Sequence, residues 1–268
     1  VTMCDDHSAL VGYAKDVALT TGGDGKAEFK VWNQSDNALV VGSFRWAVAQ
    51  AIAANGGKII FTPVGKFVVH IRAMVNVTGD NITIDAPGRN VTFVALNNVE
   101  MVRLSGQNII FRRIRFARLP HYTHVDGDNI YERDALNVDL TKANKLWIDQ
   151  CTFTESSDGA LDMASSSIDT AFAVTSLSSG FIGRRYKITA LGTTDWNTFA
   201  GTVAITYSVG DTVTMAATAV GTGTVRSADV YVTISRCLIQ RQDKGMAFGS
   251  SATSSDPAPS WAATALNE

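Results

Sequence analysis

The sequence predicts an all-β fold: a right-handed parallel β-helix with an N-terminal capping helix and a small inserted β module. Three observations lead to this prediction. A nine-residue strand motif recurs along the chain, one well-capped helix lies near the N-terminus, and the composition changes between about residues 171 and 228.

The recurring motif occupies residues 108–116, 145–153 and 231–239, which align without gaps. Each copy is apolar at its second, fourth, seventh and ninth positions, which predicts two short strands separated by one residue at a bend. Residues 81–85 and 90–93 resemble weaker copies. Recurrence of such a unit is typical of a solenoid, in which each coil buries an inward-facing column against its neighbours. The alternative is a β-sandwich of ordinary alternating strands.

The helix is predicted over residues 43–55, SFRWAVAQAIAAN. Ser43 is a favourable N-cap, the following residues favour a helix, and Asn-Gly-Gly ends it. A strand is predicted at once afterwards, over residues 58–65. A helix laid across the first coil would cover the open end of the solenoid, as a terminal repeat requires.

Residues 171–228 are rich in Thr, Ala, Gly and Ser and nearly free of acidic residues. They predict short strands joined by glycine turns, and the third copy of the strand motif resumes directly afterwards. The region is therefore interpreted as a small β module inserted in a loop, because surface loops tolerate long insertions. A disordered linker is the alternative, which the aromatic residues of the region disfavour. The predicted organisation is 1–170 for the cap and first coils, 171–228 for the insert, and 229–268 for the continued β-helix.

Composition excludes several classes of protein. Hydrophobic residues make up 46% of the chain and charged residues 18%, which indicates a folded protein. The net charge of −2, without a basic stripe, argues against a nucleic-acid partner. The apolar runs are too short for a membrane span, so no membrane association is expected. Three cysteines cannot all pair, so no disulfide framework is implied, and cytosolic, secreted and virion locations stay open.

Acidic residues follow the second copy of the strand motif. In WIDQCTFTESSDGALD, residues 147–162, an alternating strand is followed by Asp158 and Asp162, four residues apart beside a glycine. Solvated acids at the end of a coil are the plain interpretation of this pattern.

Several segments resemble, in chain order, those of the polysaccharide lyases of pectate lyase type. They are residues 11–14 with 20–25 (VGYA, TTGGDG), 43–47 (SFRWA), 58–65, 108–116, 147–153 (WIDQCTF, similar to WIDHCTF), 158–162 (DGALD), 232–235 (VTIS) and 243–250 (DKGMAFGS). One such motif is weak, whereas the ordered set is specific and spans the chain outside the insert. The insert resembles small modules of phage structural proteins.

The resemblance implies a calcium (Ca²⁺) site made of Glu132, Asp134, Asp158 and Asp162. Asp158 and Asp162 match the family's ligand pair, Asp134 matches the ligand of the preceding coil, and Glu132 matches an acid found in some members. Calcium takes about six to eight oxygen ligands, which leaves room for a substrate carboxylate and water. Asp126 and Asp128 are a further acidic pair, interpreted as part of a turn.

The resemblance also implies a reaction: calcium-dependent cleavage of polygalacturonate, the acidic polymer of pectin, by β-elimination. Lys244 matches the family's lysine and is predicted to be catalytic, and Lys244 and Arg241 are predicted to bind substrate. A secreted or virion-associated location is expected for such a protein.

Two positions depart from the family pattern. Gln150 stands where the family usually has histidine, an inner polar group that braces the coil stack. The family's catalytic base is an arginine on a later coil, whereas no arginine follows Arg241, so weak activity is expected. This departure favours a second hypothesis, a non-catalytic polysaccharide-binding β-helix of a phage particle. A third is a glycoside hydrolase, because paired carboxylates also serve that chemistry.

Overall fold

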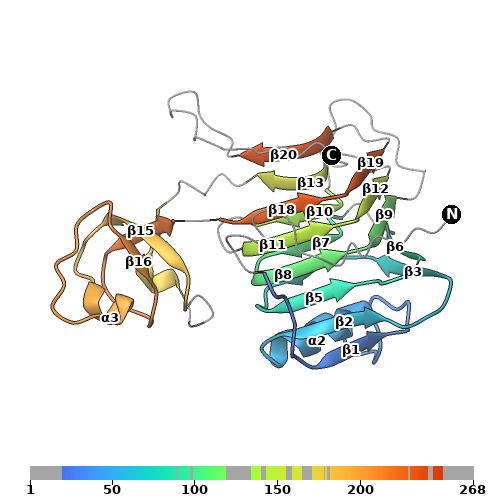
Figure 1. Cartoon of the computed structure of the whole chain (residues 1–268), viewed down its shortest axis with the longest axis horizontal. Coiled ribbons are helices and arrows are strands. Elements are labelled where there is room, and N and C mark those ends of the chain that lie inside the picture. The colour runs from blue at the N-terminus through green and yellow to red at the C-terminus, as the bar shows by residue number, and fades with distance from the viewer. Residues whose placement is uncertain are drawn as a thin grey trace.

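The structure is a computed structural model that describes residues 20–88, 90–96, 99–118, 134–139, 143–154, 159–164, 171–177, 179, 182–228, 230–240 and 244–249. It consists mostly of strands, arranged as a stack of parallel sheets with a smaller antiparallel sheet beside it (Figure 1). Within these residues, none of the helices has the length and apolar character needed to cross a bilayer.

The stack is built from three parallel sheets. Sheet 1 has six strands in the order β1 (Glu28–Val31), β2 (Gly57–Phe61), β5 (Ile82–Asp85), β8 (Gln107–Arg112), β11 (Asn144–Asp149) and β18 (Val232–Ser235). Sheet 2 has five, β3 (Lys66–Ile71), β6 (Asn90–Ala95), β9 (Ile114–Arg118), β12 (Thr152–Thr154) and β19 (Leu238–Gln240). Sheet 3 has five, β4 (Val75–Val77), β7 (Val102–Leu104), β10 (Leu136–Val138), β13 (Gly159–Ala164) and β20 (Lys244–Gly249).

From β2 onward the chain visits sheet 1, sheet 2 and sheet 3 in the same order in each successive coil. Every pairing within these three sheets is parallel. The prediction of an all-β architecture is confirmed at this level. The β-sandwich alternative, which requires antiparallel sheets, is not the arrangement of the stack.

The three copies of the strand motif lie on neighbouring coils in exact sequence register. Leu146 pairs with Ile109 on one side and Val232 on the other. Phe153 likewise pairs with Phe116 and Ile239. The apolar positions therefore stack into inward-facing columns, because strand pairing follows the pattern that buries one face.

The predicted bend of each copy lies between its two strands, at residue 113, at residues 150–151 or at residues 236–237. Arg113, Gln150 and Arg236 have φ angles of 60°, 51° and 52°, so all three adopt the left-handed conformation at the corner between sheets 1 and 2. Gln150 is half-buried at this corner. Position 150, where the family usually has histidine, therefore lies at the corner and outside the inward-facing columns.

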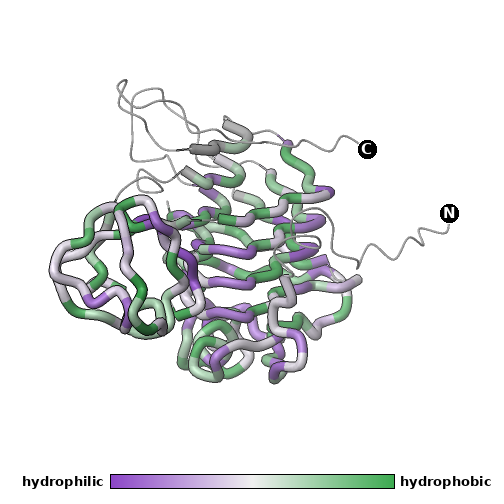
Figure 2. The backbone as a smooth tube through the Cα atoms, turned by 60° about the vertical axis from the view of Figure 1, so that its left-hand side comes forward, coloured by the Kyte–Doolittle hydropathy of each residue, from purple (hydrophilic) through white to green (hydrophobic). Residues whose placement is uncertain are grey.

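Aromatic rings fill the interior of the stack on the sheet 2 side. The rings of Phe116 and Phe153 are nearly parallel, with centroids 5.0 Å apart, and Phe93 meets Phe116 edge-on at 5.5 Å. All three side chains are fully buried. Figure 2 shows the matching alternation of hydrophobic and hydrophilic residues along the stacked coils. Stacked rings at equivalent positions give each coil an apolar surface that complements the next.

Helix α2 (Phe44–Ala53) forms where the sequence predicts a helix. The Ser43 hydroxyl accepts a hydrogen bond from the Trp46 backbone N–H at 3.0 Å, which satisfies a donor of the first turn. One face is buried in the core of the stack, through Phe44, Ala47, Val48 and Ala51. The Phe44 ring lies 4.7 Å from that of Phe93, so the helix and the first coils share one core.

Residues 171–228 form a separate antiparallel sheet. Sheet 4 has the order β14 (Phe172–Ala173), β17 (Thr224–Ser227), β15 (Arg185–Ala190) and β16 (Thr212–Thr214), with a short 3-10 helix η2 (Val174–Ser176) and helix α3 (Trp196–Ala200). It has a hydrophobic cluster of its own, around Tyr186, Phe199 and Met215. Figure 1 shows it beside the stack.

We expect the stack to fold after residues 171–228 are replaced by a short Gly/Ser linker. Phe172 pairs with Val225, so the segment enters and leaves its sheet at neighbouring positions, and β18 pairs with β11 of the stack and not with a strand of the insert. Circular dichroism and thermal unfolding would be compared with those of the full chain. A shortened chain without cooperative unfolding would show that the insert is part of the core.

Candidate functional site

Polar residues form a column on the outer face of sheet 3. In β7 and β10 the first and third residues are buried and the middle residue, Arg103 or Asn137, is half-buried on the opposite face. Asn137 pairs with Arg103 on one side and with Asp162 of β13 on the other. Alternation along strands and register between them thus align three polar side chains on neighbouring coils.

Asp134 meets this column at the start of β13. Its Oδ1 accepts a hydrogen bond from the Gly159 backbone N–H at 3.1 Å. A Cβ at position 159 would lie 2.4 Å from the same Oδ1 and 4.0 Å from the Cβ of Asp162. Glycine at 159 therefore admits the Asp134 carboxylate, and the structure brings Asp134 and Asp162 to the same side of β13.

Lys244 is the first residue of β20 and pairs in register with Gly159. Asp162 and Lys244 thus belong to the neighbouring strands β13 and β20, and Asp134 immediately precedes β10 on the other side of β13, although the chain separates Asp134 from Lys244 by an insert and a full coil. The other predicted site residues, Glu132, Asp158 and Arg241, lie outside the described residues, as do Asp126 and Asp128.

Arg103 brings a positive charge to an otherwise acidic face. Its Nη2 donates to Glu100 Oε2 at 2.7 Å and its Nε donates to Glu100 Oε1 at 3.1 Å. The hydrogen bond to Glu100 raises the pKa of Arg103; partial burial lowers it, and the charges of Glu100, Asp139 and Asp134 raise it. Arg103 therefore stays protonated within reach of several carboxylates.

Sequence reasoning did not find Arg103 or Asn137. The signal for both is the alternation in Val-Arg-Leu and Leu-Asn-Val, which places the polar residue on the outer face. Each stretch is only three residues long, and the nine-residue motif covers strands of sheets 1 and 2 alone. The sequence therefore does not show that the two residues share a column.

The side-chain oxygens on this face are suitable ligands for a hard cation such as calcium. In the described part of the chain they are too few to complete a site. Carboxylate oxygens of Asp134 and Asp162 and the amide oxygen of Asn137 are ligands that calcium prefers. Among the residues that the structure describes, no group of three or more His, Cys, Asp or Glu side chains is close enough to hold a metal. A full site therefore needs Glu132 and Asp158 in addition.

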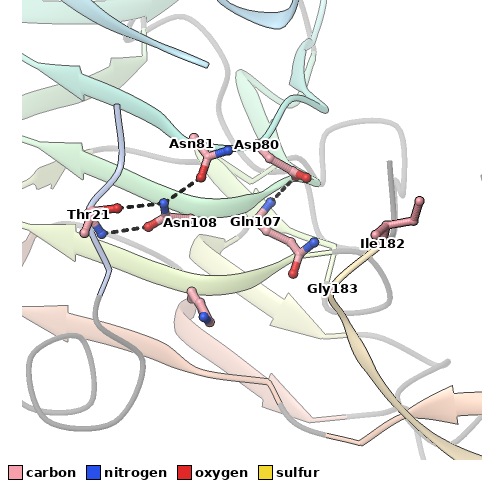
Figure 3. A pocket seen from close by; sticks show the side chains of 8 residues that line it. Thr21, Asp80, Asn81, Gln107, Asn108, Ile182 and Gly183 are labelled. Carbon is pink, nitrogen blue, oxygen red and sulfur yellow. Dashed lines mark hydrogen bonds between the residues drawn. The ribbon is translucent and has the colours of Figure 1, made fainter. Parts of the chain in front are cut away.

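A polar pocket of about 330 Å³ lies between the stack and the insert (Figure 3). Its polar groups bond to one another: Asn108 Nδ2 donates to Asn81 Oδ1 at 2.8 Å, and Asn108 Oδ1 accepts from Thr21 N at 2.7 Å. Asp80 Oδ1 accepts from Gln107 N at 2.7 Å, and burial raises the pKa of Asp80. These bonds join successive coils and tie residue 21 to them, which is a structural role.

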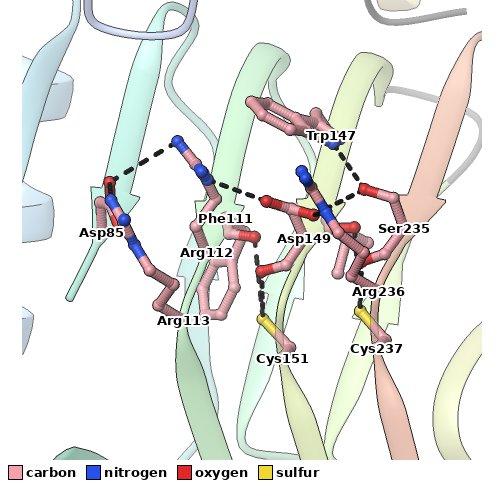
Figure 4. A network of polar contacts seen from close by, with 11 residues as sticks. Asp85, Phe111, Arg112, Arg113, Trp147, Asp149, Cys151, Ser235, Arg236 and Cys237 are labelled. Atoms are coloured by element: carbon pink, nitrogen blue, oxygen red, sulfur yellow. Dashed lines mark hydrogen bonds and ion pairs between the residues drawn. The ribbon is translucent and has the colours of Figure 1, made fainter. Parts of the chain in front are cut away.

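The charged network on the outer face of sheet 1 is also structural (Figure 4). Asp149 is fully buried and accepts from Arg112 Nε at 3.1 Å, from Arg236 Nε at 2.8 Å and from Ser235 Oγ at 2.6 Å. Trp147 Nε1 donates to Ser235 Oγ at 2.9 Å. The network fastens the coil that follows the insert to the coil that precedes it.

Neither a scan against protein-family models nor a search of curated proteins finds a match. Asp134 and Asp162 lie on the same side of β13, and the backbone of Lys244 pairs in register with Gly159 at the start of that strand.

Proposed function

We propose that the chain is a calcium-dependent pectate-lyase-like enzyme that cleaves polygalacturonate by β-elimination. The scaffold proposed for it is a right-handed parallel β-helix closed at its N-terminal end by α2. The observation that carries the proposal is that the Asp134 carboxylate binds the N–H of Gly159 in β13, the strand that also carries Asp162, and that Gly159 pairs in register with Lys244 of β20. The ordered resemblance of the sequence to pectate lyases supports the same assignment.

Asp134 and Asp162, with Glu132 and Asp158, would hold the cation. Calcium bound there supplies positive charge that stabilises the enolate-like charge developing when the C5 proton of a galacturonate leaves. The residues of the chain would orient the substrate carboxylate against this site. Lys244, which pairs in register with Gly159 at the end of sheet 3, would lie beside the substrate carboxylate and, as the neutral amine, take the C5 proton. The electrons of the C5–H bond would form the C4–C5 double bond as the C4–O glycosidic bond breaks and its oxygen leaves with the adjoining sugar.

A second candidate function is non-catalytic binding of the same polymer, as a β-helix of a phage particle. The observation that favours it is the insert, because residues 171–228 form a sheet of their own and resemble small modules of phage structural proteins. Both functions use the acidic face of sheet 3, and they differ in whether the polymer is cleaved.

Asp162→Asn is expected to weaken calcium binding by about tenfold or more, because the charge count of the ligands sets calcium affinity. The parent should gain thermal stability with calcium, as a ligand bound only to the folded state requires. It should also release unsaturated product from polygalacturonate, measured by ultraviolet absorbance with calcium and with a chelator.

Asp24→Asn is the matched control, because Asp24 is exposed and forms an ion pair with Lys58 of β2, near the far end of sheet 1. It should keep both the calcium-induced shift and the product signal. An Asp162→Asn chain that keeps the full calcium-induced shift refutes the metal assignment. Calcium-dependent binding of polygalacturonate by the parent, without product, decides for the binding function.

A further inference from the structure

A shallow groove of about 430 Å³ lies at the corner where sheet 1 turns into sheet 2. Its polar lining consists of Asn90, Arg113, Arg115, Gln150 and Thr152. No acidic residue lines it in the part of the chain that the structure describes. The groove shares no residue with the outer face of sheet 3.

We propose that this groove is a second binding site, which takes the carboxylate groups of an acidic polysaccharide without a metal. The polymer class comes from the proposed function, whereas the residues and the binding chemistry are separate from it. Because this site needs no calcium, its failure and that of the sheet 3 site are distinguishable.

Arg115 is the residue that faces the ligand. It is exposed on the outer face of β9, in register with Thr92 on one side and Thr152 on the other. Among the described residues, no acidic side chain forms an ion pair with it. An arginine in this state presents a planar set of donors that matches a carboxylate in two parallel hydrogen bonds.

Arg113 fixes the adjacent edge of the groove. Its Nε donates to Asp85 Oδ1 at 2.8 Å, and its Nη2 pairs with the other oxygen of the same carboxylate. Asp85 also lies 4.0 Å from Arg112 Nη1, so one carboxylate is shared by two arginines. The Asp85 carboxylate is thus held by Arg113, and Arg113 is held at the edge of the groove beside Arg115.

The corner continues along the stack, which suits a polymer. In the register of sheet 1, Arg112 lies opposite Asp149, and Asp149 lies opposite Ser235. The residues that follow them, Arg113, Gln150 and Arg236, therefore occupy equivalent corner positions on three coils. Adjacent strands are about 4.8 Å apart. The donors thus repeat along the stack axis, and a uronate polymer repeats its carboxylates along its own length.

The lining also selects against neutral glycans. The groove residues include amide and hydroxyl groups that suit sugar hydroxyls, but no aromatic ring on which a sugar could stack. Recognition must then come mainly from the charged hydrogen bonds of arginine, which require an anionic group on the ligand.

The test is titration of the full chain with a short oligogalacturonate in excess chelator, followed by calorimetry. The parent should bind, more weakly as salt rises. Arg115→Ala should lose about tenfold or more in affinity, because a charge-assisted hydrogen-bond pair is removed. Arg115→Lys should retain part of the affinity, and Lys30→Ala, a change of an exposed lysine on β1, should retain all of it.

Three results would overturn the proposal: no binding by the parent in chelator, unchanged affinity in Arg115→Ala, or equal binding of the methyl-esterified oligomer. Competition by inorganic phosphate at the same concentration as the oligomer would indicate a general anion site and also overturn it. Calcium-induced stabilisation, measured on the same Arg115→Ala chain, should equal that of the parent. An Arg115→Ala chain that loses affinity for the oligomer in chelator but keeps its calcium-induced stabilisation therefore separates this site from the one on sheet 3.

Discussion

Replacing Asp149 by alanine is expected to lower the free energy of unfolding by about 3–5 kcal/mol, because a buried ion pair loses one partner. The Asp149 side chain has no solvent exposure, and that of Arg112 has only 8%. Without the carboxylate, the Arg112 guanidinium keeps its desolvation cost and loses its closest carboxylate among the described residues, while Asp85 is more distant and the centroid of the Trp147 ring is 4.5 Å from its Cζ. Chemical denaturation monitored by circular dichroism measures the loss.

Two further variants test this explanation. Arg236→Ala should cost less, because the Arg236 side chain is 29% exposed and water replaces part of its interaction. An Asp149→Ala/Arg112→Ala chain should be less destabilised than the sum of the two single changes, because neither charge is then left buried alone. Asp24→Ala, at an exposed ion pair, should leave stability unchanged. If Asp149→Ala costs under about 1 kcal/mol, the network does not hold the coils together.

Lys244→Ala is expected to lower turnover of polygalacturonate by about 10²- to 10⁴-fold, the usual effect of removing a general acid or base. The reason is its position, at the start of β20 and in register with Gly159, whose N–H binds the Asp134 carboxylate. The measurement is the rate of unsaturated product at saturating calcium and polymer.

The calcium response separates a role in chemistry from a structural role for Lys244. The variant should keep the calcium-induced rise in thermal stability, since Lys244 is not a metal ligand. Met246→Leu, a volume-conserving change in the same strand, should keep the parental rate. A Lys244→Ala chain that turns over at the parental rate would show that another group takes the proton.

The alternating apolar residues determined the parallel stacking of the coils. The second position of the motif is apolar in all three copies, as residue 109, 146 or 232. The structure pairs residue 146 with the other two. Register is this predictable because slipping a strand by one residue would expose its buried face. The helix near the N-terminus was equally visible, since a serine cap and an Asn-Gly end mark it locally.

The composition of residues 171–228 also indicated a region that differs from the coils, and the structure shows an antiparallel sheet there. The identity of the corner residues was less predictable. Arg113, Gln150 and Arg236 adopt a left-handed conformation that costs free energy for a side chain, and glycine would be the usual choice. The pattern of residues within one strand does not show that Arg113 forms an ion pair with Asp85, or that Arg236 forms one with Asp149.

The sequence by itself determined the coil repeat, the inward-facing apolar columns, the helix and the acids that follow the second copy of the motif. Only the tertiary structure decided which outward-facing residues meet. Asp134 reaches Gly159, Arg103 aligns with Asn137 and Asp162, and Asp149 joins Arg112 to Arg236 across the insert. Burial of apolar surface sets the register of each coil locally, whereas contacts between outer faces depend on loop lengths and stacking, which the alternation of residues within one strand does not encode.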